Sequence, residues 1–150
     1  LNAECMLYLA PLFVDSAETK RALIEDCGLN RLLEVAKTLD LAIISCGDLG
    51  TTGSSMTMDF LSPAERDALR AAGAICDAGC NFLDAEGHDV DTPLRHRIVN
   101  VDLGTISEAG HVILAAGGAK RAVAIRATVL RTKCRTLITD EAAANALLSL

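Results

Sequence analysis

The chain has 150 residues, a length typical of a single domain with a substantial core. Although 51% of the residues are hydrophobic, the apolar runs are short and broken by glycine, proline or aspartate, so we expect no membrane-spanning segment and no signal peptide. The net charge of −6 argues against a segment that grips nucleic acid by itself.

The first part of the chain predicts one strand followed by two helices. Residues 5–10 have the pattern of a buried strand, which residues 12–14 extend. Asp15 is the expected cap of the next helix, with Glu18 completing a capping box, and Asn30 is the expected cap of a second helix. Because strand-like sequence begins almost at once and the first residue is not methionine, we expect a piece of a longer protein.

A glycine-rich loop follows the next predicted strand. Residues 41–46 have the pattern of a buried strand, and residues 47–55 form a Gly/Ser/Thr segment directly after it. Open α/β sheets bind ligands at loops that follow parallel strands, so this loop is a candidate binding element. A flexible surface loop remains the alternative, because periodicity does not separate the two.

A helix and a carboxylate-bearing strand come next. Ser62, Pro63 and Glu65 form a strong helix start, in which serine caps, proline takes the first position and glutamate reaches back. We expect this helix to end at Gly73. The strand that starts there presents Asp77 at its end, where the carboxylate could be a general base, an acceptor for a sugar hydroxyl or merely a cap.

The remaining segments complete an α/β pattern. Residues 82–83 predict another strand, residues 84–87 a hairpin turn, residues 97–103 an alternating strand and residues 136–139 a last strand, with Asp140 capping the closing helix. Because strands and helices alternate through most of the chain, we expect an α/β domain: a mostly parallel sheet flanked by helices, with one small antiparallel excursion at the hairpin turn.

The segment from residue 110 to residue 130 has the pattern of an anion-binding loop. Residues 112–116 predict a strand buried on both faces, Gly117 and Gly118 break it, and a helix starts at Ala119. The glycines let a ligand approach the backbone, the first helical N–H groups are expected to be unpaired, and Lys120 adds a full positive charge. A plain connection in an α/β domain is the alternative.

Six basic residues and no acidic residue lie between residues 120 and 139. This basic stretch could be a DNA-binding patch, a solvated helix face or a local field that favours small anions. The overall negative charge and the lack of interleaved aromatic residues favour the solvated face over DNA binding.

Catalytic and metal-binding motifs are few. The six cysteines lack the spacing of a metal site or a disulfide framework, so we expect reduced, mostly buried thiols of a cytosolic protein. The three histidines form no metal-ligand spacing, and the chain contains no nucleophile elbow and no Walker motif. Binding needs only an acceptor and an anion clamp, whereas catalysis also needs a matched acid and base. We therefore expect a binding domain without metal or cofactor rather than an enzyme.

Four spaced motifs resemble the sugar-binding domain of the SorC family of bacterial transcriptional regulators. They are Gly-Ala-Ile-Cys-Asp from residue 73, Phe-Leu-Asp-Ala-Glu-Gly from residue 82, Ala-Gly-Gly-Ala-Lys from residue 116 and Leu-Ile-Thr-Asp-Glu from residue 137. The similarity runs in unbroken order over essentially the whole chain. It implies a fold like that of ribose-5-phosphate isomerases and glucosamine-6-phosphate deaminases (the NagB/RpiA/CoA-transferase-like fold).

The resemblance also implies a function and a site. Residues 1–150 would form the effector-binding domain of a cytoplasmic, generally oligomeric regulator, whose upstream helix-turn-helix binds DNA and whose effector is a phosphorylated sugar. By this resemblance the loop with Gly117, Gly118 and Lys120 lies at the effector pocket, Asp77 accepts ligand hydroxyls, and the glycine loop at Gly47 faces the pocket. The alternatives are a sugar-phosphate isomerase or deaminase on the same scaffold, and a structural oligomerisation module.

The chain departs from the family pattern in two respects. The family usually has glycine where this chain has Cys76 and Cys80, so we expect a difference in backbone geometry there. The family's first phosphate-binding loop and its helix-turn-helix normally precede the region that matches Cys5, and neither is present in this chain. We therefore expect an incomplete domain with weakened effector binding.

Overall fold

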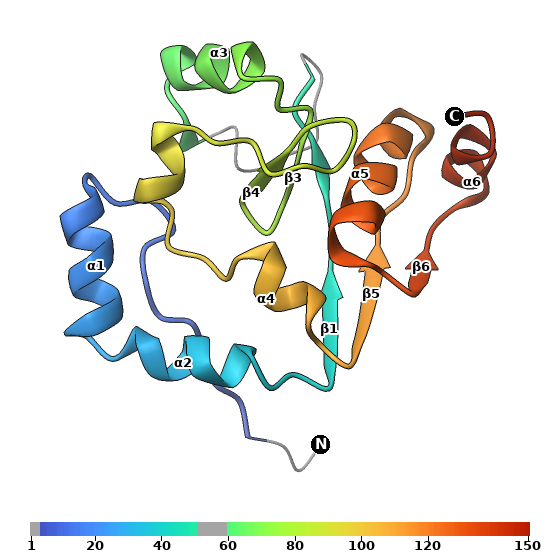
Figure 1. Ribbon diagram of the computed structural model, residues 1–150. Helices are drawn as coiled ribbons and strands as arrows, with labels where there is room; N and C mark the ends of the chain where they lie inside the picture. The colour runs from blue at the N-terminus through green and yellow to red at the C-terminus, as the bar shows by residue number, and fades with distance from the viewer. Residues whose placement is uncertain (1–3, 51–59) are drawn as a thin grey trace.

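Two small sheets organise the computed structural model, which describes residues 4–50 and 60–150 (Figure 1). The first is parallel, with the strand order β1-β5-β6, and the second is antiparallel, with the order β2-β3-β4. The strands are β1 (Leu41–Ile44), β2 (Gly47–Asp48), β3 (Cys76–Ala78), β4 (Asn81–Leu83), β5 (His111–Ala115) and β6 (Thr136–Ile138). The predicted α/β class, with a parallel sheet and an antiparallel excursion, is confirmed.

Helices surround these sheets, with α1 and α2 at one end of the domain and α5 and α6 beside the parallel sheet (Figure 1). The α-helices are α1 (Ala17–Glu25), α2 (Leu29–Ala36), α3 (Pro63–Ala71), α4 (Leu103–Ser107), α5 (Ala122–Thr132) and α6 (Glu141–Leu147). Two 3₁₀ turns, η2 (Pro93–Arg97) and η3 (Ala119–Arg121), precede α4 and α5. Across residues 4–50 and 60–150, every helix is too short or too polar to cross a bilayer.

Helix α5 packs against both sheets and forms the centre of the main core. Ile125 is fully buried among Leu83 of β4, Leu103 of α4 and Leu114 of β5. Alanines on the same helix face allow close approach, and the Cys76 Sγ atom of β3 lies 3.9 Å from the carbonyl oxygen of Ala124. The position of α5 therefore ties the antiparallel sheet to the parallel one.

The predicted helix start at Ser62 is confirmed in detail. The Ser62 hydroxyl accepts the Glu65 N–H at 3.3 Å, and the Glu65 carboxylate accepts the Ser62 N–H at 2.8 Å. The predicted cap of the closing helix is also confirmed, since Asp140 accepts the Ala143 N–H at 2.8 Å. Helix α3 ends at Ala71, with Gly73 at a φ of 87° beyond it, as expected for a glycine that follows a helix.

The predicted caps of the first two helices are wrong. Ser16, not Asp15, caps α1 by accepting the Thr19 N–H at 3.1 Å. Asp15 instead accepts the Thr19 hydroxyl at 2.8 Å, which leaves the capping position to its neighbour. Helix α2 begins one residue before Asn30, because Gly28 adopts a φ of 82° and turns the chain into the helix.

Two predicted strands do not form. Residues 5–10 are irregular and carry exposed apolar side chains, with Leu9 81% exposed. Residues 97–103 contribute one isolated bridge, between Phe13 and Ile98. Their apolar side chains are nevertheless buried, since Ile98 and Val99 enter two different core clusters.

The parallel strands are buried on one face rather than on both. Val112 and Leu114 of β5 are buried on the side of α5, whereas Ile113 between them is only half-buried. On β1, an edge strand, Leu41 and Ile43 are 46% and 67% exposed. The expectation of two buried faces is wrong for the described residues, because the helices among them cover only one.

The predicted turn at residues 84–87 is confirmed. The Gly87 N–H donates to the carbonyl of Asp84 at 3.2 Å, and Leu83 forms an antiparallel bridge to Asp89. A tighter hairpin, not predicted from the sequence, joins β3 to β4, and Gly79 and Cys80 in its turn both have positive φ angles.

Candidate functional site

The predicted site residues lie on segments that meet at one edge of the parallel sheet. Strands β1 and β5 pair in parallel register, with Ile44 opposite Leu114, so both chains leave the sheet at its carboxyl edge. Gly47 follows β1 there and pairs with Asp77 across β2 and β3. The loop with Gly117 and Gly118 follows β5, and η3, which carries Lys120, lies against β2. Residues 51–55 of the predicted glycine loop lie outside the described part of the chain.

Asp77 lies in the middle of β3 rather than at its end, and it is only 7% exposed. Its Oδ2 atom accepts the N–H of Cys80 at 3.4 Å, across the turn that joins β3 to β4. The carboxylate is therefore a buried group oriented by a hairpin.

The loop at Gly117 and Gly118 already holds an anion, the carboxylate of Asp140. The Gly118 N–H donates to Oδ2 of Asp140 at 2.6 Å, while Oδ1 of the same carboxylate caps α6. A Cβ atom at position 117 would collide with Oδ2 of Asp140, which explains why this position is glycine. The N–H of Gly118, just before the first turn, is therefore paired within the protein.

Asp140 is ionised at neutral pH. The N–H groups of Ala143 and Gly118 lower the pKa of this carboxyl below its ordinary value, and the charge of Arg121 lowers it further. From the sequence Asp140 is predictable only as a helix cap, because its second partner lies 22 residues away in the chain. No local pattern signals a contact of that kind.

Lys120 supplies an available positive charge beside this loop. Its side chain is exposed on η3, one 3₁₀ turn before α5, rather than in the first turn of an α-helix. Within residues 4–50 and 60–150 its ammonium group forms no hydrogen bond and no ion pair. An incoming anion would therefore not have to displace an internal partner from Lys120.

Two buried cysteines, Cys46 and Cys76, directly precede the site residues Gly47 and Asp77. Burial raises the pKa of Cys46, and burial together with the neighbouring Cys46 and Asp77 raises that of Cys76 to about 12. Cys46 and Cys76 are buried, whereas Cys5 and Cys27 are exposed, so the expectation of mostly buried cysteines holds for only part of the set. The buried pair is protonated at neutral pH and unsuited to nucleophilic chemistry.

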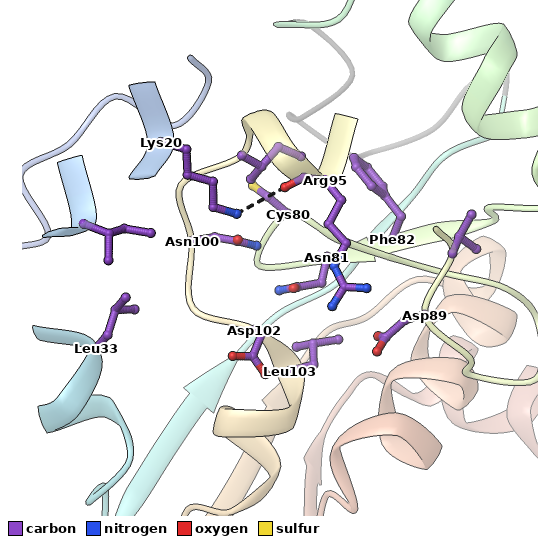
Figure 2. A pocket seen from close by; sticks show the side chains of 13 residues that line it. Lys20, Leu33, Cys80, Asn81, Phe82, Asp89, Arg95, Asn100, Asp102 and Leu103 are labelled. Atoms are coloured by element: carbon purple, nitrogen blue, oxygen red, sulfur yellow. Dashed lines mark hydrogen bonds between the residues drawn. The ribbon is translucent and has the colours of Figure 1, made fainter. Parts of the chain in front are cut away.

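A separate cavity of about 280 Å³ lies between α1, α2, η2, β4 and α4 (Figure 2). Its walls are both polar and apolar, and none of the five predicted site residues lines it. This cavity is not predictable from local sequence patterns, because its walls come from segments far apart in the chain.

Comparison with known proteins identifies the family. A family model described as "Putative sugar-binding domain" matches residues 1–149. The chain belongs to this sugar-binding domain family.

This sugar-binding domain has relatives among bacterial regulators. It is 28% identical over 155 residues to the transcriptional regulator LsrR of Klebsiella pneumoniae, and the alignment covers 100% of this chain and 48% of LsrR. It is 26% identical to the deoxyribonucleoside regulator of Bacillus subtilis, with 93% of this chain and 44% of the relative covered. The domain therefore spans about half the length of the curated relatives it matches.

Solved structures share the fold of this sugar-binding domain. The full-length sorbitol operon regulator SorC from Klebsiella pneumoniae superposes with a TM-score of 0.88 at 22% identity, over 99% of this chain and 48% of that chain. A transcriptional regulator from Streptococcus pneumoniae superposes with a TM-score of 0.88 at 20% identity, over 97% and 56% of the two chains.

In this sugar-binding domain Cys80 has a φ of 62°, which is a left-handed conformation that glycine favours. The backbone at this position is therefore of the kind that a glycine would adopt, and cysteine occupies it at a conformational cost.

Proposed function

We propose that this chain binds a phosphorylated sugar at the carboxyl edge of its parallel sheet, as the effector-binding domain of a bacterial transcriptional regulator. The observation that supports this most directly is the convergence of the predicted segments at one edge. Gly47 and Asp77 pair there, and the exposed Lys120 stands beside the Gly117–Gly118 loop.

Each group has a distinct role in the proposal. The Lys120 ammonium binds the phosphoryl group, because its charge is not neutralised within the described residues. Asp77 accepts sugar hydroxyls, and Gly118, where an added Cβ would meet open space, allows close approach to the backbone. Gly47 is placed beside Asp77 by the pairing of β2 with β3, and Gly117 leaves room for the Asp140 carboxylate that holds the loop. Asp140 holds the Gly118 N–H and thereby keeps the loop in place beside Lys120.

The regulatory step takes place in the full-length protein. A relative is a deoxyribonucleoside regulator, and a structural neighbour is a sorbitol operon regulator. In our proposal the effector binds more tightly to one of two subunit arrangements of a homo-oligomer, and this difference in affinity changes DNA binding by a helix-turn-helix outside this chain. The six free thiols agree with a reducing, cytoplasmic location.

The test is Lys120→Ala in the full-length regulator, with binding to operator DNA followed by fluorescence anisotropy. We expect unchanged operator affinity without effector and loss of the response to the phosphorylated sugar that shifts the wild type. Lys37→Ala is the matched control, because Lys37 is exposed and paired to Glu34 on the distant helix α2. A normal response in Lys120→Ala, or turnover of ribose 5-phosphate or glucosamine 6-phosphate by the intact protein, would contradict the proposal.

A further inference from the structure

We propose that the cavity in Figure 2 is a second ligand site, which binds a small hydroxylated anion such as a sugar acid or a sugar phosphate. The anionic group would lie against Lys20 and Arg95, and the hydroxyl groups against Asn81 and Asn100. The volume of about 280 Å³ is close to the lower limit of typical small-molecule pockets, which suits a monosaccharide derivative. This site goes beyond the proposed function, because it shares none of the five residues at the sheet edge.

Two cations meet in this cavity. The Lys20 Nζ atom donates to the carbonyl oxygen of Arg95 at 3.2 Å, and this bond holds the ammonium on the cavity wall that also carries the Arg95 side chain (Figure 2). Partial burial and the Arg95 charge lower the pKa of Lys20. Within the described residues the Arg95 guanidinium forms no ion pair. A bound anion would offset both the repulsion between Lys20 and Arg95 and the solvation that Lys20 loses on burial.

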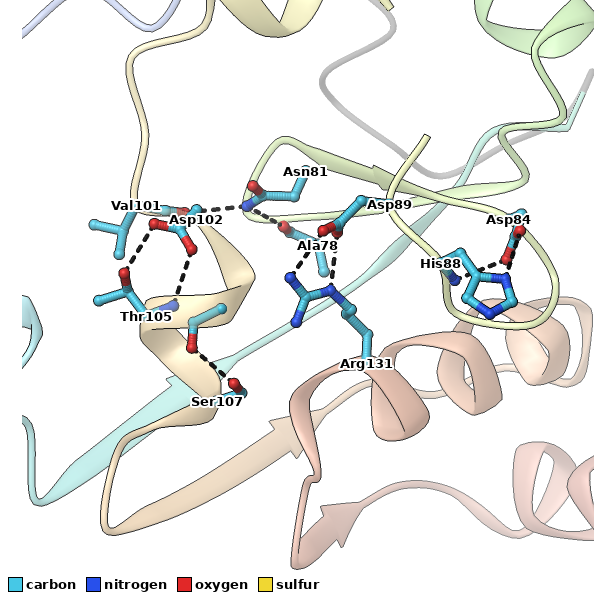
Figure 3. Close-up of polar contacts among 11 residues, drawn as sticks. Ala78, Asn81, Asp84, His88, Asp89, Val101, Asp102, Thr105, Ser107 and Arg131 are labelled. Atoms are coloured by element: carbon cyan, nitrogen blue, oxygen red, sulfur yellow. Dashed lines mark hydrogen bonds and ion pairs between the residues drawn. The ribbon is translucent and has the colours of Figure 1, made fainter. Parts of the chain in front are cut away.

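The carboxylates that line the cavity are committed elsewhere (Figure 3). Asp89 forms a bidentate ion pair with Arg131 of α5, with N–O distances of 2.9 and 2.8 Å. Asp102 caps α4, because it accepts the Thr105 N–H at 2.9 Å and the Thr105 hydroxyl at 2.8 Å. Asp102 raises the pKa of Lys20, but burial and Arg95 have the larger effects. Asp89 is therefore neutralised by Arg131, and the charges of Lys20 and Arg95 together exceed that of Asp102, so the charge that remains for a ligand is positive.

The amides of the cavity present acceptors. The Asn81 Nδ2 atom donates to the backbone carbonyls of Ala78 and Val101, both at 3.1 Å, and the Asn100 Nδ2 atom donates to that of Gly79 at 3.0 Å. Both donor hydrogens of Asn81 and one of Asn100 are thus used within the protein, and the oxygens of both amides can accept hydroxyl hydrogens from a ligand. Apolar side chains such as Phe82 complete the wall and can pack against carbon-bound hydrogens of a sugar.

Lysine footprinting of the full-length protein tests this site and the sheet-edge site separately. The native protein is reductively methylated with and without D-gluconate or D-ribose 5-phosphate, and labelling of each lysine is quantified by peptide mass spectrometry. At a probe concentration ten times its dissociation constant, we expect the labelling rate of Lys20 to fall about tenfold for at least one probe. Protection of Lys120 reports on the sheet-edge site, and Lys37 is the unprotected reference.

The variant Arg95→Gln tests whether protection of Lys20 results from ligand binding in the cavity. Arg95 is exposed, and among the described residues its hydrogen bonds use only its backbone N–H and carbonyl groups, so this variant keeps the fold. We expect it to abolish the protection of Lys20 and leave that of Lys120 unchanged, whereas Arg126→Gln on the exposed face of α5 changes neither. The proposal is wrong if neither probe protects Lys20, if neutral D-ribose protects it equally, or if Arg95→Gln leaves the protection intact.

Discussion

Replacing Cys80 with glycine is expected to stabilise the protein relative to replacing it with alanine. Cys80 occupies the turn between β3 and β4 with a φ of 62°, where an L-residue has an unfavourable contact between its Cβ atom and the backbone. Cys80→Ala keeps that contact and removes the sulfur. Cys80→Gly removes both, so the comparison between the two variants isolates the conformational cost.

The magnitude follows from two opposing effects. A left-handed conformation costs a residue other than glycine about 1–2 kcal/mol. Glycine loses roughly 0.4–1 kcal/mol more chain entropy on folding than alanine does. The glycine variant should therefore be more stable than the alanine variant by about 0.5–1 kcal/mol, and in a domain of this size about 1 kcal/mol corresponds to roughly 2–4 °C in Tm.

The assay is urea unfolding and thermal unfolding of the full-length protein, followed by circular dichroism. Gly79→Ala is the matched control, because Gly79 has a φ of 55° in the same turn and the nearest atom to an added Cβ would be the Asn81 Nδ2 atom at 3.9 Å. It should destabilise the protein by a similar amount. If Cys80→Gly is no more stable than Cys80→Ala while Gly79→Ala is destabilised, the conformational cost assigned to Cys80 is refuted.

Three further predictions concern packing and ionisation. Gly87→Ala should destabilise the folded protein by more than about 1 kcal/mol, because a Cβ there would lie 2.7 Å from a carbonyl oxygen of α5. Gly73→Ala, at a similar φ but with open space around the added Cβ, should reduce the free energy of unfolding by less, and urea unfolding compares the two variants. Asp140 has a lowered pKa in the folded protein, so it stabilises above its unfolded pKa of about 4 and this stabilisation is lost as the pH falls through the folded value. Asp140→Asn should therefore flatten the acid side of the stability profile, which urea unfolding at a series of pH values measures. Iodoacetamide at pH 8 should label the exposed Cys27 and leave Cys76 unmodified, because Cys76 is buried and has a pKa of about 12; fast labelling of Cys76 in mass spectra would contradict its burial.

Helix starts were predictable where neighbouring side chains bond the first backbone N–H groups of the helix. Ser62 and Glu65 satisfy each other's backbone N–H groups within a span of four residues, so the pattern alone identifies the structure. The prediction failed at Asp15 because two adjacent residues can both cap, and the Thr19 hydroxyl bonds Asp15 while its N–H bonds Ser16. Such competition depends on rotamers, which the sequence pattern does not contain.

The candidate site was predictable as a set of segments but not as a set of contacts. Glycine after a parallel strand and a lysine in the following turn are local signals, and they identified Gly117, Gly118 and Lys120 as candidates. The bond from Gly118 to Asp140 depends on β5 and β6 lying side by side in parallel register, so it follows from the fold alone. The cavity at Lys20 likewise depends on how α1 packs beside η2.

The continuous apolar runs of the parallel strands predict burial of both sheet faces, but among the described residues only one face is buried. Parallel strands are usually covered on both faces, and this is why their sequences are continuously apolar rather than alternating. Here α5 covers the face with Val112 and Leu114, while Leu41, Ile43 and Ile138 remain 46%, 67% and 58% exposed. Each such side chain leaves a large part of its burial free energy, about 1.5–3 kcal/mol when complete, unrealised. The continuous apolar pattern is therefore matched by burial on one face of the β1-β5-β6 sheet, while large apolar side chains of the described residues stay exposed on the other face.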